Sequence, residues 1–267
     1  MNLKGSNKDH IFEYMLTNTL FSIPFGLSVF LMYIALIFCV IDEYRWGGVL
    51  EDRLLYMLQV ATDYGIGIVI IPIFAAVPIG SRTTDIISGY RCIGRTTRKR
   101  YVSSQIVSSI ISGFLVIMIP LLLFIITLLI LGYRGVGFGI EGTYEDTVIY
   151  FFLMEGNGML ILLMRCVLLS LFGASCAVLV TLLSMFTSNR YILCALPFII
   201  IEIFHFCTNW QCVVFFLNPM VTFLSCTPYI NYYPFGGIPN ALLYHITWIL
   251  IFSLIYKTVY KWRFLNG

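Results

Sequence analysis

The chain has 267 residues, of which 60% are hydrophobic and only 11% are charged, and its mean hydropathy is +0.92. Soluble domains carry about 25% charged residues, so this chain lacks the polar groups to cover its own surface, and a soluble globular enzyme is excluded. Because each membrane crossing takes about 20 apolar residues, there is room for roughly six crossings and for no separate catalytic domain.

The sequence therefore predicts an all-α polytopic membrane protein in which residues 1–267 form a single transmembrane domain. Residues 1–17 mix charged with apolar and aromatic side chains, which is typical of a short amphipathic helix at the membrane surface. The expected spans are six apolar stretches at about 20–41, 64–80, 106–131, 160–186, 191–207 and 241–256.

The segment 210–240 precedes the last span and is apolar on both sides of Asn218-Pro219. Each half is too short to cross a bilayer, and an Asn-Pro pair ends a helix. We therefore expect a re-entrant pair of short helices that is broken at these two residues.

Positive charge is distributed unevenly along the chain. If both termini lie in the cytoplasm, 12 of the 16 lysines and arginines lie on that side, and six of them occupy the loop after the second span. The positive-inside rule therefore predicts cytoplasmic N and C termini. Most acidic residues fall on the opposite side, so the net charge of +3 does not describe a nucleic-acid surface, and no nucleic-acid partner is expected.

Catalytic and metal-binding motifs are absent from the sequence. It holds no GxxxxGK[ST] phosphate loop, no HExxH and no GxSxG. The eight cysteines form no CxxC pair, and no histidine lies at ligand spacing from them, so we expect no catalytic site and no metal site. Cys212 and Cys226 share one non-cytoplasmic segment, which leaves a disulfide between them open.

The most informative segment is the loop between the second and third spans. Asp85 is followed four residues later by Gly89, and a basic cluster from Arg98 to Tyr101 opens the third span. This pattern resembles the corresponding loop of ABC-2 type permeases, the membrane subunits of ATP-binding cassette exporters, although aspartate replaces the more usual glutamate. The interfacial helix, the six spans and the re-entrant pair are also similar to that family, and the likeness covers nearly the whole chain.

The resemblance implies that this loop contains a coupling helix, which receives force from a soluble ATPase. The implied coupling residues are Asp85, Gly89, Arg91, Gly94, Arg95, Arg98 and Arg100. Glycines permit sharp turns, and arginines can pair with acidic residues of the ATPase or with lipid headgroups. The alternative is that these arginines only set the topology.

The resemblance also implies a transport subunit that is not itself an enzyme and binds no cofactor directly. Two copies of a separate ATPase would bind ATP and magnesium, and a second permease, identical or homologous, would complete an exporter in the bacterial cytoplasmic membrane. Its cargo would be amphipathic, such as a peptide antibiotic, a drug or a lipid-like molecule. The alternatives are a standalone secondary carrier or channel, and a membrane scaffold or sensor.

The ionisable residues Arg165, Glu202 and His205 fall inside the expected spans, where a charge costs about 2.5–3.5 kcal/mol. Glu202 and His205 are three residues apart and share a helix face. They either line a substrate path or form a hydrogen bond that holds helices together. Arg165 lies near the external end of the fourth span, and we expect its side chain to reach back to the headgroups. The alternatives for Arg165 are a place in the substrate path and a role in helix packing.

Overall fold

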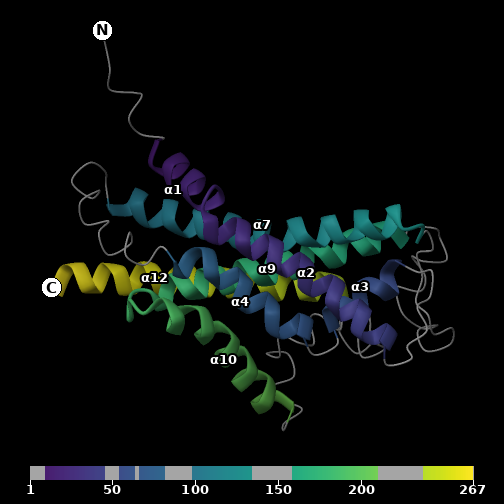
Figure 1. Cartoon of the computed structure of the whole chain (residues 1–267). Helices are drawn as coiled ribbons and strands as arrows, with labels where there is room; N and C mark the ends of the chain where they lie inside the picture. Colours follow the sequence, from purple (N-terminus) through teal and green to yellow (C-terminus); the bar gives the residue numbers. More distant parts are fainter. Residues whose placement is uncertain are drawn as a thin grey trace.

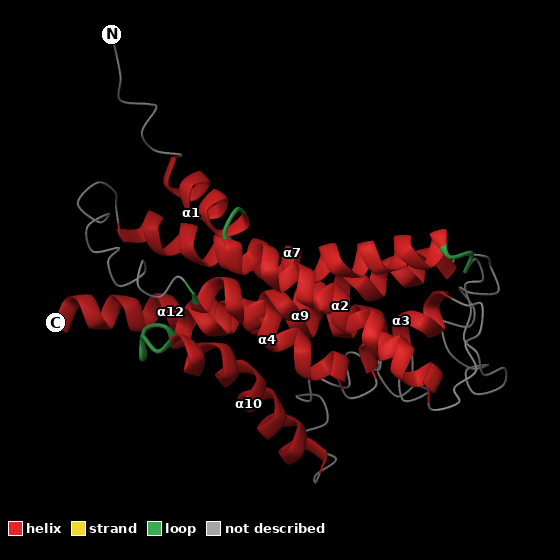
Figure 2. Cartoon of the chain, viewed as in Figure 1, coloured by secondary structure: helices red, strands yellow, loops and turns green. Residues whose placement is uncertain are grey.

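The computed structural model describes residues 10–45, 54–63, 66–81, 98–133, 158–209 and 237–266, and nearly all of these are helical (Figures 1 and 2). The helices are α1 (His10–Leu20), α2 (Ile23–Arg45), α3 (Leu54–Asp63), α4 (Ile66–Gly80), α7 (Arg98–Ile130), α9 (Gly158–Leu183), α10 (Arg190–Asn209) and α12 (Gly237–Asn266). The described residues contain no strand, which confirms the all-α class.

Among the described helices, four are long and apolar enough to cross a membrane. The qualifying segments belong to α2, α7, α9 and α12, and they are Ile23–Ile41, Lys99–Ile130, Leu162–Leu183 and Leu242–Arg263. Large apolar side chains such as Phe30, Ile126 and Leu254 are exposed on the outside of the bundle, as expected of a surface that faces lipid. The chain is thus a multi-pass membrane protein, and the number of six crossings stays a prediction.

The helix boundaries differ from the expected spans in three places. No expected span accounts for α3, α7 begins at Arg98 rather than near 106, and α12 continues to Asn266, well beyond 256. A run of apolar residues marks only the part of a helix that suits lipid, whereas the backbone hydrogen bonds continue through polar residues. In contrast, α4 has 15 residues, fewer than the roughly 20 that a crossing takes.

The N-terminal helix α1 begins at His10, so only part of the expected interfacial helix over 1–17 lies within the described residues. It packs along the first half of α7, where its Thr19 Oγ1 lies 3.5 Å from Ser108 Oγ. Met15 packs against the buried cluster that includes Tyr101. The position of α1 relative to a membrane surface stays a prediction.

Helix α9 lies at the centre of the bundle. It packs most extensively against α7 and α12, and then against α4. Of its apolar segment 83% is buried, compared with 28% for α2 and 22% for α12. The surrounding helices therefore shield α9, while α2 and α12 form much of the outer surface (Figure 1).

Small residues allow α7 and α9 to approach closely. A Cβ atom on Gly113 would lie 2.4 Å from Ala177 Cβ and 2.7 Å from the carbonyl oxygen of Gly173. Farther along the same contact, the hydroxyls of Ser109 and Thr181 are hydrogen bonded at 2.7 Å. Close packing of small residues and hydroxyl hydrogen bonds are what join helices in membranes. We call these five residues the α7–α9 seam.

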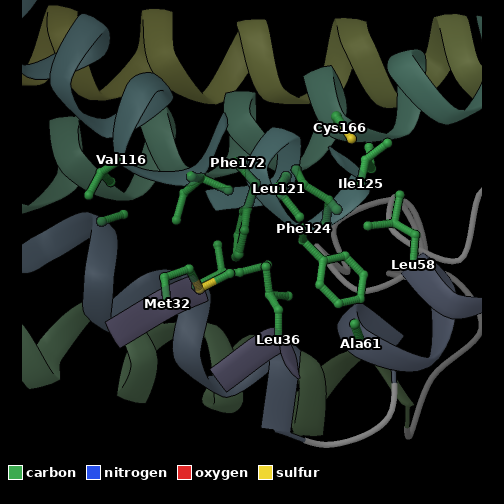
Figure 3. Close-up of a cluster of buried hydrophobic side chains, with 14 of the residues drawn as sticks. Met32, Leu36, Leu58, Ala61, Val116, Leu121, Phe124, Ile125, Cys166 and Phe172 are labelled. Carbon is green, nitrogen blue, oxygen red and sulfur yellow. The ribbon is translucent and has the colours of Figure 1, made fainter. Parts of the chain in front are cut away.

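The largest hydrophobic core lies where α2, α3, α4, α7 and α9 meet (Figure 3). Met32 of α2, Leu58 of α3, and Leu121 and Phe124 of α7 are each at most 2% exposed in this cluster. Helix α3 therefore has a packing role. Its ten residues are too few to span a bilayer, but they contribute buried side chains to this core.

Candidate functional site

A small groove with a volume of about 50 Å³ lies between α9, α10 and α12, and it is partly open to the outside of the described helices. We call it the aromatic groove, because half of its lining residues have aromatic rings. It is lined by Phe172, Ser175, Cys176 and Leu179 of α9, Ile200 and Ile201 of α10, and Tyr244, His245, Trp248 and Phe252 of α12.

The groove is open because α10 is held to the bundle at its start and then diverges from α12 (Figure 1). Asn189 caps the helix, since its Oδ1 accepts a hydrogen bond from the backbone N–H of Tyr191 at 3.0 Å. Close to this cap, Leu193 is fully buried, and a Cβ on Gly80 of α4 would lie 3.1 Å from Cys194 Sγ. These contacts fix the start of α10, and among the described residues the groove lies beside Ile200 and Ile201, farther along the helix.

Aromatic side chains of α12 form one wall of the groove. Tyr244, Trp248 and Phe252 follow each other at intervals of four residues, so they share one helix face. The ring centroids of Tyr244 and Trp248 are 6.2 Å apart in an edge-on arrangement, and those of Trp248 and Phe252 are 5.1 Å apart. Such pairs stabilise each other beyond the area that they bury, so this wall is a preformed surface.

His245 is the most enclosed polar residue of the groove, with only 1% of its side chain exposed. Its ring centroid lies 5.8 Å from that of Phe172 and 5.3 Å from that of Tyr244. The hydroxyl of Ser175 donates to the Phe172 carbonyl at 2.7 Å. The lining residues include no carboxylate and no amine, so the groove suits apolar and aromatic groups with a few polar contacts.

A second surface lies where α7 begins and α12 ends. Five exposed cations gather there, and we call them the basic end: Lys99, Arg100, Lys257, Lys261 and Arg263. The two helix ends meet through Tyr101 and Tyr260, whose ring centroids are 6.4 Å apart. Arg263 Nη1 donates to the carbonyl of Met185, just after α9, so α9 ends at the same place.

The structure describes only part of the expected coupling segment. Five of its residues lie outside the described part of the chain, namely Asp85, Gly89, Arg91, Gly94 and Arg95. Arg98 is the first residue of α7, and Arg100, two residues later, has an exposed side chain. Their role in coupling stays a prediction.

Glu202 and His205 both belong to α10, three residues apart as the sequence indicates. Glu202 is half-buried and directly follows Ile200 and Ile201, but it is not among the residues that line the groove. The side chain of His205 lies outside the described part of the structure, as do Asn218-Pro219 and the cysteines of segment 210–240. A contact between Glu202 and a substrate stays a prediction.

Arg165 does not lie where the sequence suggests. Only 3% of its side chain is exposed, and its Nη2 donates to Thr62 Oγ1 of α3 at 3.4 Å. The expectation that Arg165 reaches the headgroups is therefore wrong. The position of Arg165 in the sequence indicates its depth in the membrane. Its neighbours, however, depend on which face of α9 carries it, and that face packs against α3. Arg165 thus joins α9 to α3 in the bundle interior.

The sequence did not single out the residues of the aromatic groove. The available signal was the interval of four residues between Tyr244, Trp248 and Phe252, which by itself is common in apolar helices. The partners from α9 and α10 are distant in sequence, so only the fold brings them together. Among the described residues, no group of three or more His, Cys, Asp or Glu side chains could hold a metal ion.

Comparison with known proteins gives no further assignment: no family model matches the chain, and no match was found among curated proteins or solved structures. The resemblance to ABC-2 type permeases therefore rests on the sequence motifs, above all on those between α4 and α7.

Proposed function

We propose that the chain is the permease subunit of an ATP-binding cassette exporter of the ABC-2 type, which moves an amphipathic substrate out of a bacterial cell. The observation that carries this proposal is the arrangement of the helix ends. α4 ends and α7 begins at the end of the bundle where the basic tail of α12 also lies (Figure 1). The segment 82–97, which holds five of the seven expected coupling residues, thus connects two bundle helices at the basic end.

In this proposal the basic end faces the cytoplasm, together with both termini, in accordance with the positive-inside rule. Helices α4 and α10 supply the two crossings beyond the four that are long and apolar enough. The re-entrant pair, expected over 210–240, lies between α10 and α12 and ends before residue 237, where α12 begins. Two copies of a soluble ATPase bind ATP and magnesium below the membrane, and a second permease, identical or homologous, completes the exporter.

The described contacts support a route for force. A push on segment 82–97 would act on the last turn of α4 and the first turn of α7. Both helices pack extensively on α9, and the α7–α9 seam holds α7 in close contact with α9. A rigid-body shift of these helices would therefore reach the opposite face of α9, where the aromatic groove offers apolar and aromatic surface to an amphipathic cargo.

The decisive experiment purifies the full chain from its native host and identifies the proteins that remain bound. We expect an ATPase with a phosphate loop, and a neighbouring gene that encodes one is equivalent support. If neither exists, the exporter proposal fails and a standalone carrier, channel or scaffold takes its place.

A charge reversal tests the coupling segment itself. We expect Arg95→Glu or Arg98→Glu to reduce transport-linked ATPase activity while membrane insertion is retained, because the acidic surface of an ATPase would be repelled. Arg45→Glu is the matched control, since Arg45 ends α2 at the far end of the bundle. ATPase activity that is unchanged in the Arg95 and Arg98 variants contradicts a coupling role.

A further inference from the structure

Helices α7 and α12 are longer than a bilayer requires. At 1.5 Å per residue, the 33 residues of α7 and the 30 residues of α12 extend about 50 and 45 Å, whereas the hydrocarbon core is about 30 Å thick. Both helices therefore project beyond it. The contact between Tyr101 and Tyr260 places the first turn of α7 level with the last turns of α12, so the cations of both helices lie at one depth.

The positive charge at the basic end is not neutralised by any of the described residues. Lys99, Arg100, Lys257 and Lys261 are exposed and form no ion pair with any residue in the described part of the chain. The start of α7 adds the positive end of its helix dipole. Arg263 differs from these four, because it donates to the Met185 carbonyl and so helps to hold the helix ends together.

One stripe of α12 combines this charge with apolar surface. Leu250, Leu254, Lys257 and Lys261 are spaced by four, three and four residues, so they lie on a single face of the helix. Leu250 and Leu254 are 57% and 61% exposed, and both lysines are exposed. The face therefore changes from apolar to cationic along its length, over about 16 Å.

The surroundings of the stripe are those of a membrane interface. Trp262 is 66% exposed beside Lys261, and tryptophan is enriched at the headgroup level of membranes. Underneath, Tyr101, Tyr256 and Tyr260 form a buried cluster in which the Tyr256 hydroxyl has no hydrogen-bond partner among the described residues.

We propose that the Leu250–Lys261 stripe, together with Lys99 and Arg100, binds an anionic phospholipid. Its phosphate-bearing headgroup contacts the cations, and an acyl chain follows the exposed leucines of α12. A lipid fits better than an acidic protein surface, because a lipid matches both halves of the stripe, whereas an acidic surface would match only the lysines. The inference depends on the membrane location of the chain and not on its proposed export activity.

The test measures lipid binding by the full chain reconstituted in nanodiscs of phosphatidylglycerol or of phosphatidylcholine. Lipid retained after transfer to detergent is counted by native mass spectrometry, and thermal unfolding is followed in parallel. We expect the wild type to retain phosphatidylglycerol preferentially and to unfold at a higher temperature with it. The variant Lys257→Gln/Lys261→Gln should bind phosphatidylglycerol about 30-fold more weakly, which is roughly fivefold for each lysine.

Two controls separate a binding site from a general effect of charge. Arg45→Gln/Arg53→Gln removes the same number of cations, at the end of α2 and just before α3 in the sequence, and should leave the preference unchanged. Lys257→Arg/Lys261→Arg keeps the charge and should also retain it. Equal retention of the two lipids by the wild type overturns the proposal. The proposal is also overturned if Lys257→Gln/Lys261→Gln loses no more phosphatidylglycerol than Arg45→Gln/Arg53→Gln does. Loss of a bound protein partner without loss of this lipid counts against the proposal in the same way.

Discussion

Two faces of α9 are packed in opposite ways. On the α7–α9 seam, glycine, alanine and hydroxyl side chains bring two helices so close that an added methyl group would overlap a neighbouring atom. At the aromatic groove, phenylalanine, tyrosine, tryptophan and histidine side chains surround space that the described helices do not fill. One helix therefore provides both a rigid contact and an open surface.

The difference between the tightly packed seam and the open groove follows from the lipid that surrounds the helices. Lipid tails are as apolar as leucine, so burying leucine between helices gains little, and close contact and hydrogen bonds must join them. Small residues make that contact possible in the seam. Large rings on α12 instead fill part of the space beside α9, while α10 diverges and leaves the remainder open. We therefore expect the seam to be rigid and sensitive to larger side chains, and the groove to accept them.

The same substitution at both faces should give the largest contrast. Ser109 and Ser175 are both buried serines of long helices, but Ser109 hydrogen bonds across the seam and Ser175 lines the groove. We expect Ser109→Leu to lower the free energy of unfolding by about 3 kcal/mol or more, since it overpacks the seam and removes a hydrogen bond. Ser175→Leu has room and should change it by less than about 1 kcal/mol.

Denaturant unfolding of the detergent-solubilised protein measures both values. Equal losses at the two sites would contradict the distinction between seam and groove. If the groove carries cargo, Ser175→Leu should in addition reduce export, because the new side chain occupies the space, while the fold remains stable.

A single methyl group should give a smaller effect of the same kind. Gly113→Ala places a Cβ against Ala177 and the Gly173 backbone, so we expect a loss of about 1–3 kcal/mol in the free energy of unfolding. Gly26→Ala is the matched control on α2, since nothing lies within 4 Å of the added atom. Adding Ala177→Gly to the Gly113 variant should recover part of the loss, and no recovery would locate the strain elsewhere.

The smallest expected effect is that of the hydrogen bond between Ser109 and Thr181. A double-mutant cycle with Ser109→Ala and Thr181→Val should give a coupling energy of about 0.6 kcal/mol, the usual size for such bonds between membrane helices. The pair Ser109→Ala and Thr247→Val should show none, because Thr247 is exposed on α12 and bonds only to its own helix. A coupling energy of zero between Ser109 and Thr181 would mean that van der Waals contact is the main source of stability of the α7–α9 seam.

The sequence predicted the helical class and a helix for every expected span, because runs of apolar residues have few alternatives in a membrane. It did not predict α3, which is too short for a crossing yet buries Leu54, Met57 and Leu58 completely. It also placed the start of α7 too late, because Arg98 and its polar neighbours belong to the helix although they do not suit lipid.

The site was less predictable than the fold, because rotation about a helix axis decides which residues meet. Arg165 was expected at the headgroups but packs inward against Thr62. The sequence did not single out His245, whereas the fold places its ring beside Phe172, 73 positions earlier in the chain. Spacing along one helix predicts neighbours on that helix, but it does not predict contacts with another.

The enclosure of α9 has a consequence for biosynthesis. A chain emerges from the ribosome in order, so α9 enters the membrane before α12, which covers one of its faces. Until the last helix is made, Ser175, Cys176 and their neighbours have no permanent cover. The native state can therefore form only after synthesis is complete, and a chain that stops before residue 237 should be recognised as unfinished by the proteases that remove misassembled membrane proteins.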